Sequence, residues 1–244
     1  MLQTVRGMGY EGLELSSLHF EGRLEEFKSL LEKSGFTVSS VYKFFDFGHQ
    51  IDRNELERYI GDLSFLGAEK TLIVPGFFTE NSDREKEFAR MTEALALLCE
   101  LAEPLGIMVT LEDFDDVNSP CSTANGLRRF MDAVPKLRFT LDTGNFRFSG
   151  EDVLRSYEIL KDRLGHVHLK DRAAKQLTEG DRGPTAVDGV ILYPAPAGGG
   201  YIPIGKCIRQ TMSDGYDSWY SVEHFNAADV LKYIKQSAEY LRQF

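Results

Sequence analysis

Short apolar runs rich in β-branched residues alternate along this chain with longer segments of helical period. That alternation is typical of repeated strand–helix units, which build a parallel sheet covered by helices. The expected strands are residues 12–15, 36–41, 71–74, 107–111, 137–141, 166–169 and 218–222. The expected helices are residues 2–8, 24–34, 53–66, 84–105, 128–134, 151–164 and 228–241.

Seven strands are one short of the eight that close a (β/α)8 barrel. The chain begins in a helical pattern, and no strand pattern precedes it. A doubly wound sheet is the alternative, but no glycine-rich phosphate turn follows the first strand. We therefore expect an α/β protein with a (β/α)8 TIM-type barrel that lacks the first strand.

The length of 244 residues fits one α/β domain, and no linker divides the chain, so we expect a single domain over residues 1–244. Only residues 171–203 depart from the strand–helix rhythm, because they are rich in glycine and proline. Connections this long are usually functional or disordered. We interpret the segment as a long mobile loop, with a lid as one interpretation. Its Gly198-Gly199-Gly200 run lacks the spacing of a dinucleotide-binding turn.

The net charge of −10 argues against nucleic acids and anionic membrane surfaces as partners, because both require basic contacts. No apolar run approaches the roughly 18 residues that span a bilayer, and the N-terminus lacks the apolar run of a signal peptide. Cys99, Cys121 and Cys207 form no CxxC pair, which favours reduced thiols. We expect a cytoplasmic protein.

Four potential metal ligands fall at the ends of four successive predicted strands. Glu112, Asp142 and Glu223 directly follow apolar strand residues, and His168 lies near the end of its strand. Strand ends of a barrel converge on one mouth, so these side chains should meet. Three carboxylates at close range repel one another unless a cation neutralises them. The mainly oxygen ligand set suits Mn²⁺, Mg²⁺ or Co²⁺ and also admits Zn²⁺, so we expect one divalent ion.

Other polar residues lie near the same predicted mouth. His166 lies on the same strand face as His168 but deeper, which favours a hydrogen-bonded core histidine. Lys170 follows that strand, and we predict it to contact substrate or to serve as a further acid/base group. His19 and His49 lie just past the ends of the first two strands, and we predict both to bind substrate.

Four segments resemble the sugar phosphate isomerase/epimerase family, part of the xylose isomerase-like TIM barrel superfamily. They are residues 9–15 (GYEGLEL), 141–145 (LDTGN), 166–171 (HVHLKD) and 221–224 (SVEH). The resemblance covers nearly the whole chain, and the family's first strand has no counterpart. It implies that Glu112, Asp142, His168 and Glu223 bind one divalent metal ion. It also implies that Glu112 and Glu223 act as acid/base groups on opposite faces of a sugar.

The activity implied is that of a metal-dependent isomerase or epimerase of a sugar, sugar acid or ketose. It would remove a proton next to a carbonyl through a metal-bound enediolate, since a metal that bridges carbonyl and hydroxyl oxygens acidifies that carbon. The sequence differs from ketose epimerases at Asn145, Asn118 and Ala174, where that group carries histidine, glutamate and arginine. Arg172 lies near the last of these, and we predict Asn145 and Arg172 to bind substrate.

Three alternatives stay open. A metal-dependent lyase that dehydrates an inosose or a dehydroshikimate-type compound would begin with the same proton abstraction. An apurinic endonuclease would need a trinuclear zinc site, which five histidines and the acidic charge disfavour. A non-catalytic sugar-binding barrel is the alternative from another class. A homo-oligomer is expected only by analogy with similar enzymes.

Overall fold

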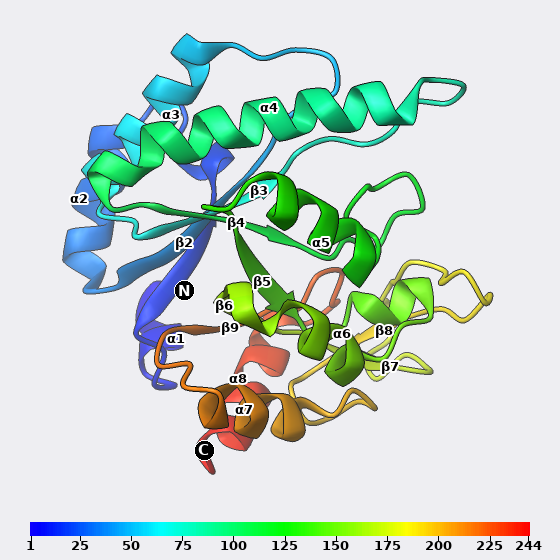
Figure 1. Ribbon diagram of the computed structural model, residues 1–244. Coiled ribbons are helices and arrows are strands. Elements are labelled where there is room, and N and C mark those ends of the chain that lie inside the picture. Colours follow the sequence, from blue (N-terminus) through cyan, green and yellow to red (C-terminus); the bar gives the residue numbers. More distant parts are fainter.

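Seven parallel strands curve into a nearly closed barrel in the computed structural model, which describes residues 1–244 (Figure 1). The strands are β1 (Gly12–Ser16), β2 (Thr37–Phe44), β3 (Lys70–Val74), β4 (Met108–Glu112), β5 (Arg138–Asp142), β6 (Leu164–Leu169) and β9 (Tyr220–Val222). They follow one another in chain order around the sheet. The expected TIM-type barrel is therefore confirmed, with seven strands where a closed barrel has eight.

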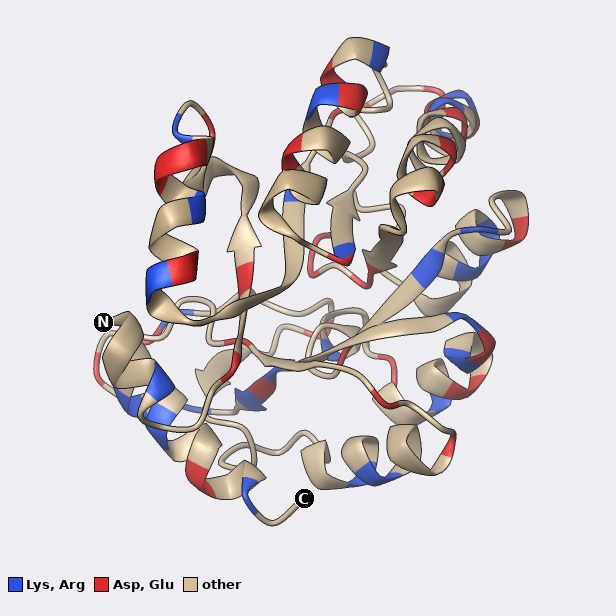
Figure 2. Cartoon of the chain, turned by 90° about the vertical axis from the view of Figure 1, so that its left-hand side faces the viewer, with Lys and Arg blue, Asp and Glu red and all other residues tan.

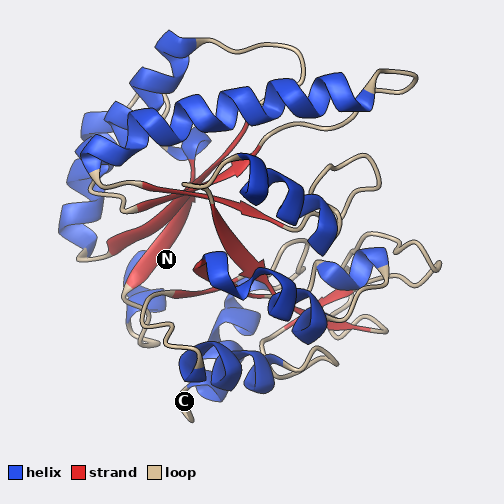
Figure 3. Ribbon diagram, in the orientation of Figure 1, coloured by secondary structure: helices blue, strands red, loops and turns tan.

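Helices surround the sheet on its outside (Figures 1 and 3). They are α1 (Leu2–Arg6), α2 (Leu24–Ser34), α3 (Arg53–Leu66), α4 (Arg84–Ala102), α5 (Ala124–Ala133), α6 (Val153–Leu160), α7 (Ile204–Ser213) and α8 (Val230–Leu241). Short 3-10 turns add η1 (Ser17–His19), η2 (Glu103–Leu105), η3 (Phe146–Ser149) and η4 (Lys161–Arg163). None of these helices has the length and apolar character needed to cross a membrane.

Local sequence signals set most helix ends. Asp52 and Asp83 cap the N-termini of α3 and α4, where their carboxylates accept backbone N–H groups that have no helical partner. Gly35 and Gly67 end α2 and α3 with φ of 70° and 78°, a left-handed conformation that glycine adopts without steric cost. The structure thus confirms these two helix ends where the sequence places them.

The barrel seam lies between β1 and β9, which are the two ends of the sheet. Each is hydrogen-bonded to one neighbour only, β1 to β2 and β9 to β6. A Cβ added to Gly12 would lie 3.0 Å from the Trp219 ring, so the indole packs tightly against the β1 backbone. Side-chain packing therefore joins the two edges where a ladder of hydrogen bonds is missing.

Apolar side chains from the strands and the inner helix faces form one continuous core of 42 buried residues. Charged side chains lie mainly on the outer helices and loops, as Figure 2 shows. Parallel sheets are covered on both faces in this way, so a polar group inside the barrel is an exception that calls for a partner.

Two elements differ from the sequence-based expectations. Residues 171–203 are not one long loop, because β7 (Asp171–Ala173) and β8 (Tyr193–Ala195) pair as an antiparallel hairpin. Short strands with two prolines nearby give little periodic signal, which is why the sequence did not reveal them. Helix α7 was also not predicted, since the preceding glycine run obscures its start.

Asp171 ties this hairpin to the glycine-rich turn that follows it. Its buried carboxylate accepts backbone N–H groups of Arg172 at 2.8 Å, Gly198 at 2.9 Å, Gly200 at 3.0 Å and Ile202 at 3.0 Å. Four donors on one carboxylate use both of its oxygens. The turn at residues 198–202 is therefore held in place directly beside Arg172.

We predict that Asp171→Asn lowers the free energy of unfolding by about 2–4 kcal/mol. The new amide NH₂ would face two of the four backbone N–H groups and leave them without an acceptor. Urea unfolding followed by circular dichroism measures the change. Asp188→Asn, at an exposed aspartate of the same segment, is the control that should change stability little. Equal stability of the Asp171 variant and the wild type would contradict the prediction.

Candidate functional site

Three of the predicted metal ligands meet at the carboxyl ends of β4, β5 and β6. Glu112 and Asp142 are the last residues of their strands, and Asp142 lies beside His168 in the β5–β6 ladder. One donor atom from each of the three residues lies within 4.8 Å of the others. His168 Nδ1 is 3.0 Å from Glu112 Oε2 and 4.0 Å from Asp142 Oδ2. All three side chains are buried.

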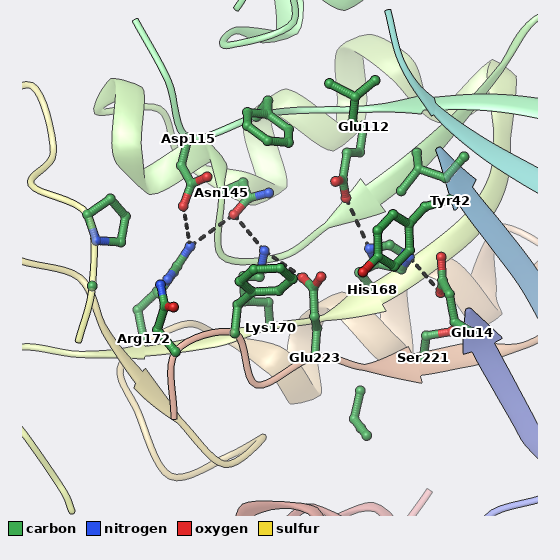
Figure 4. Close-up of a pocket in the computed structure, with 18 of the residues that line it drawn as sticks. Glu14, Tyr42, Glu112, Asp115, Asn145, His168, Lys170, Arg172, Ser221 and Glu223 are labelled. Carbon is green, nitrogen blue, oxygen red and sulfur yellow. Dashed lines mark hydrogen bonds and ion pairs between the residues drawn. The ribbon is translucent and has the colours of Figure 1, made fainter. Parts of the chain in front are cut away.

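Glu223, the fourth predicted ligand, reaches this group through Lys170. The Lys170 ammonium lies 2.9 Å from Asp142 Oδ2. It also lies 2.5 Å from Glu223 Oε2 (Figure 4). It also donates a hydrogen bond of 2.9 Å to Asn145 Oδ1. Glu223 directly follows β9, as the strand-end rule predicts, so four successive strands supply this group of side chains.

Asn145 and Arg172 form the adjoining part of the site. Arg172 donates to Asn145 Oδ1 at 3.0 Å and pairs with Asp115 at the same distance. The Asn145 amide in turn donates to the backbone oxygen of Asp113. One amide oxygen thus accepts from both Lys170 and Arg172, which fixes the direction of both cations.

Glu14 is a central residue that the sequence did not reveal. It lies within β1, and its Oε2 is 2.9 Å from His168 Nε2 and 3.2 Å from His166 Nε2. His166 is fully buried and also contacts Ser221 Oγ at 3.0 Å, as expected for a hydrogen-bonded core histidine. The available signal was an acid between Leu13 and Leu15, on the opposite strand face from both leucines.

Burial raises the pKa values of the carboxyl groups in this site, and the neighbouring cations lower them. Burial raises the pKa of Glu112 to about 7, and the nearby Glu223 and Asp142 add to the rise. Burial also raises the pKa of Asp142, although Lys170 opposes the change. Burial works against the charge of Glu223, yet Lys170 and His168 bring its pKa below the ordinary value.

His168 and Lys170 are the cations of the metal-free site. Burial opposes the charge of His168, but Glu14 and Glu112 outweigh it and raise its pKa well above the usual range. The pKa of Lys170 is likewise raised, because Asp142 and Glu223 outweigh the burial of the ammonium. Four carboxylates, Glu14, Glu112, Asp142 and Glu223, surround these two cations, so acidic groups are in excess.

A cavity of about 590 Å³ opens onto these side chains. Its polar part includes Glu14, Glu112, Asn145, His168 and Lys170. Aromatic and aliphatic side chains also line it, and these are Tyr42, Phe44, Leu72, Val74, Phe114, Val222 and Phe225. A largely apolar cavity with a few convergent polar groups is typical of a small-molecule site.

His19 and His49 do not line this cavity, in contrast to the expectation that both lie at the mouth. His19 lies in η1 and accepts the Ser16 backbone N–H, which closes a capping turn after β1. His49 pairs with Asp46 at 2.8 Å and with Glu87 at 3.2 Å. A position just past a strand end was therefore not enough to place either histidine in the cavity, because both rings form local hydrogen bonds instead. Arg172 and Asn145, by contrast, do line the cavity.

The donor set fits a divalent cation. Asp142 Oδ2 and Glu223 Oε2 are buried and have no aligned hydrogen-bond donor, although the Lys170 ammonium lies close to both. Carboxylate oxygens together with one imidazole nitrogen suit Mg²⁺, Mn²⁺ or Zn²⁺. Glu112, Asp142 and His168 already have the spacing of metal ligands. Glu223 would become a fourth ligand if Lys170 moved away from it.

The chain matches the xylose isomerase-like TIM barrel family over residues 2–244. The inosose dehydratase of Lacticaseibacillus casei is 25% identical over 146 residues, which is 57% of this chain and 47% of that protein. Inosose dehydratase 2 of Bacillus cereus is 26% identical over 225 residues, 89% of this chain and 71% of that protein. This chain spans about half the length of the first of these relatives.

Solved structures with the same fold include enzymes of different reaction types. The probable 3-DHS dehydratase AsbF of Bacillus anthracis superposes with a TM-score of 0.77 at 17% identity, over 99% of this chain and 92% of that one. The 3-keto-D-glucoside 4-epimerase YcjR of E. coli superposes with a TM-score of 0.76 at 17% identity, over 100% of this chain and 93% of that one. The IOLI protein, solved with a zinc atom, superposes with a TM-score of 0.77 at 16% identity, over 99% of this chain and 90% of that one.

We predict that Lys170→Met lowers the free energy of unfolding of the metal-free protein by about 3–5 kcal/mol. Removal of this ammonium leaves the buried Asp142 and the half-buried Glu223 without the cation that they share. Urea unfolding in the presence of a chelator measures this. Lys175→Met, at an exposed lysine on the same segment, should leave the midpoint nearly unchanged. If both variants behave alike, Lys170 does not hold the carboxylates together.

Proposed function

This chain belongs to the xylose isomerase-like TIM barrel family, and we propose that it is a divalent-metal-dependent isomerase or epimerase of a small sugar-derived carbonyl compound. The observation that carries the proposal is the buried cluster of Glu112, Asp142 and His168, with Glu223 and Lys170 beside it. Glu112, His168, Lys170 and Glu223 of this group line one cavity. The acidic excess of this cluster calls for a further cation, and the cavity has room for a monosaccharide-sized ligand.

Four residues, Glu112, Asp142, His168 and Glu223, would hold the metal ion. When bound, a divalent ion would polarise the substrate carbonyl and acidify the neighbouring C–H bond. It would also neutralise the carboxylates that now face only Lys170 and His168. IOLI with zinc is a protein of the same fold in which a metal has been found, and this supports the assignment.

The side chains of the chain itself supply the proton transfers. Glu112 lines the cavity and would take and return a proton at the substrate carbon. Glu223 lines the same cavity and would be the second acid/base group. Lys170 can donate a hydrogen bond to the oxygen on which negative charge develops, and Asn145 holds its ammonium in direction. Arg172, fixed by Asp115, would bind a distal oxygen of the substrate.

A dehydratase is the second candidate, and the inosose dehydratase relatives favour it. Both reactions begin with removal of a proton next to a carbonyl. They differ afterwards, because an epimerase or isomerase returns the proton, whereas a dehydratase expels a hydroxyl from the adjacent carbon as water. Lys170 or Glu112 could protonate that leaving hydroxyl.

We predict that the wild type binds about one equivalent of Mn²⁺ and that Glu223→Gln weakens binding at least about tenfold, because a charged ligand is lost. Activity of the variant should fall about 10²–10⁴-fold, the usual contribution of an acid/base group. Isothermal titration calorimetry measures binding, and a panel of ketoses, sugar acids and inososes measures activity. Glu179→Gln, at an exposed glutamate, is the matched control.

The same panel, run in D₂O, distinguishes the two candidate reactions. An isomerase or epimerase gives a product of unchanged composition that carries deuterium at the reacting carbon. A dehydratase gives a product that has lost water. If the purified protein binds no divalent metal and turns over no compound of the panel, the enzyme proposal is wrong and a sugar-binding barrel replaces it.

A further inference from the structure

Two imidazoles point toward a single carboxylate oxygen beside the predicted metal ligands. Glu14 Oε2 lies 2.9 Å from His168 Nε2, a close charge contact without the alignment of a hydrogen bond (Figure 4). The same oxygen lies 3.2 Å from His166 Nε2. The opposite nitrogen of the His168 ring, Nδ1, faces Glu112 and Asp142. His168 therefore lies between a carboxylate at one nitrogen and the candidate metal ligands at the other.

An imidazole binds a metal only through a nitrogen that carries no proton. For His168, the nitrogen on the metal side is Nδ1, so the proton of the neutral ring must be on Nε2. An ionised carboxylate can only accept a hydrogen bond. A carboxylate 2.9 Å from Nε2 therefore favours the tautomer that carries its proton on Nε2 and leaves the Nδ1 lone pair free.

We propose that Glu14 is a positioning residue that presents His168 Nδ1 to the divalent metal ion, an inference that rests on the metal-dependent function proposed above. His166 completes this arrangement. Its Nε2 forms a hydrogen bond of 3.2 Å with the same Glu14 oxygen, and its ring is nearly perpendicular to that of His168 at a centroid distance of 5.2 Å. Contact with Ser221 Oγ anchors His166 in turn.

The three residues Glu14, His166 and His168 also satisfy the spacing of a metal site by themselves. Two ions, one on each side of His168, would require a fully deprotonated imidazolate. Glu112 and Asp142 supply two carboxylates on the Nδ1 side, whereas the Nε2 side offers only one carboxylate, Glu14, and a second histidine. The ligand count and the negative charge therefore favour the Nδ1 side for the ion and a supporting role for Glu14.

The test compares Mn²⁺ affinity of the wild type, Glu14→Ala and Glu14→Gln by isothermal titration calorimetry. We expect Glu14→Ala to weaken binding about 10–100-fold, the usual effect of losing a partner of a metal-bound histidine. Glu14→Gln keeps an oxygen that faces His168 but loses the negative charge. The Mn²⁺ affinity of this variant should therefore lie between those of the wild type and Glu14→Ala. Glu11→Gln, at an exposed glutamate just before β1, should bind like the wild type.

A second readout is the ¹⁵N spectrum of the histidine rings in the Zn²⁺-loaded protein. The wild type should show a proton on His168 Nε2 and a metal-bound Nδ1, and Glu14→Ala should lose this single protonation pattern. Glu14→Gln decides the matter if Glu14→Ala does not fold. Unchanged affinity in the folded variants, or metal bound through His168 Nε2, overturns the inference and leaves the proposed function standing. A wild type that binds no metal refutes both.

Discussion

The repulsion among buried carboxylates at the carboxyl ends of the strands is the interaction on which the rest of the site depends. Glu14, Glu112, Asp142 and Glu223 come from four different strands or strand ends, and the barrel brings them together. Charges of one sign in a buried space are unstable without partners. Lys170 and His168 supply two positive charges in the metal-free state, and a divalent ion would supply more.

The elements around the site maintain this balance of charge. Asn145 directs Lys170 and Arg172, and Asp115 pairs with Arg172, so each cation has a defined position. Asp113, next to Glu112, is buried without a hydrogen-bond partner for its carboxyl oxygens, and burial raises its pKa well above the usual range.

The alternation of strand and helix patterns allowed the sequence to predict the fold, and the strand-end rule predicted which side chains meet at its mouth. Glu112, Asp142 and Glu223 were predictable because each follows an apolar strand and because barrel strands end at one mouth. Glu14 was not, since it lies within a strand and its role depends on the opposite position of His168 across the barrel. His19 and His49 show the converse, because both follow strands and yet local hydrogen bonds direct them elsewhere. The hairpin of β7 and β8 depends on contacts of Asp171 with residues about thirty positions away, which no local pattern records.

The most direct test of the central claim is an anomalous-scattering map from crystals of the protein grown with Mn²⁺. The account predicts one strong peak in contact with Glu112, Asp142, Glu223 and the Nδ1 atom of His168, with the Lys170 ammonium displaced from Glu223. No peak in the barrel would contradict a metal-dependent site. A peak among Glu14, His166 and His168 Nε2 would contradict the assignment of ligands and of the supporting role of Glu14.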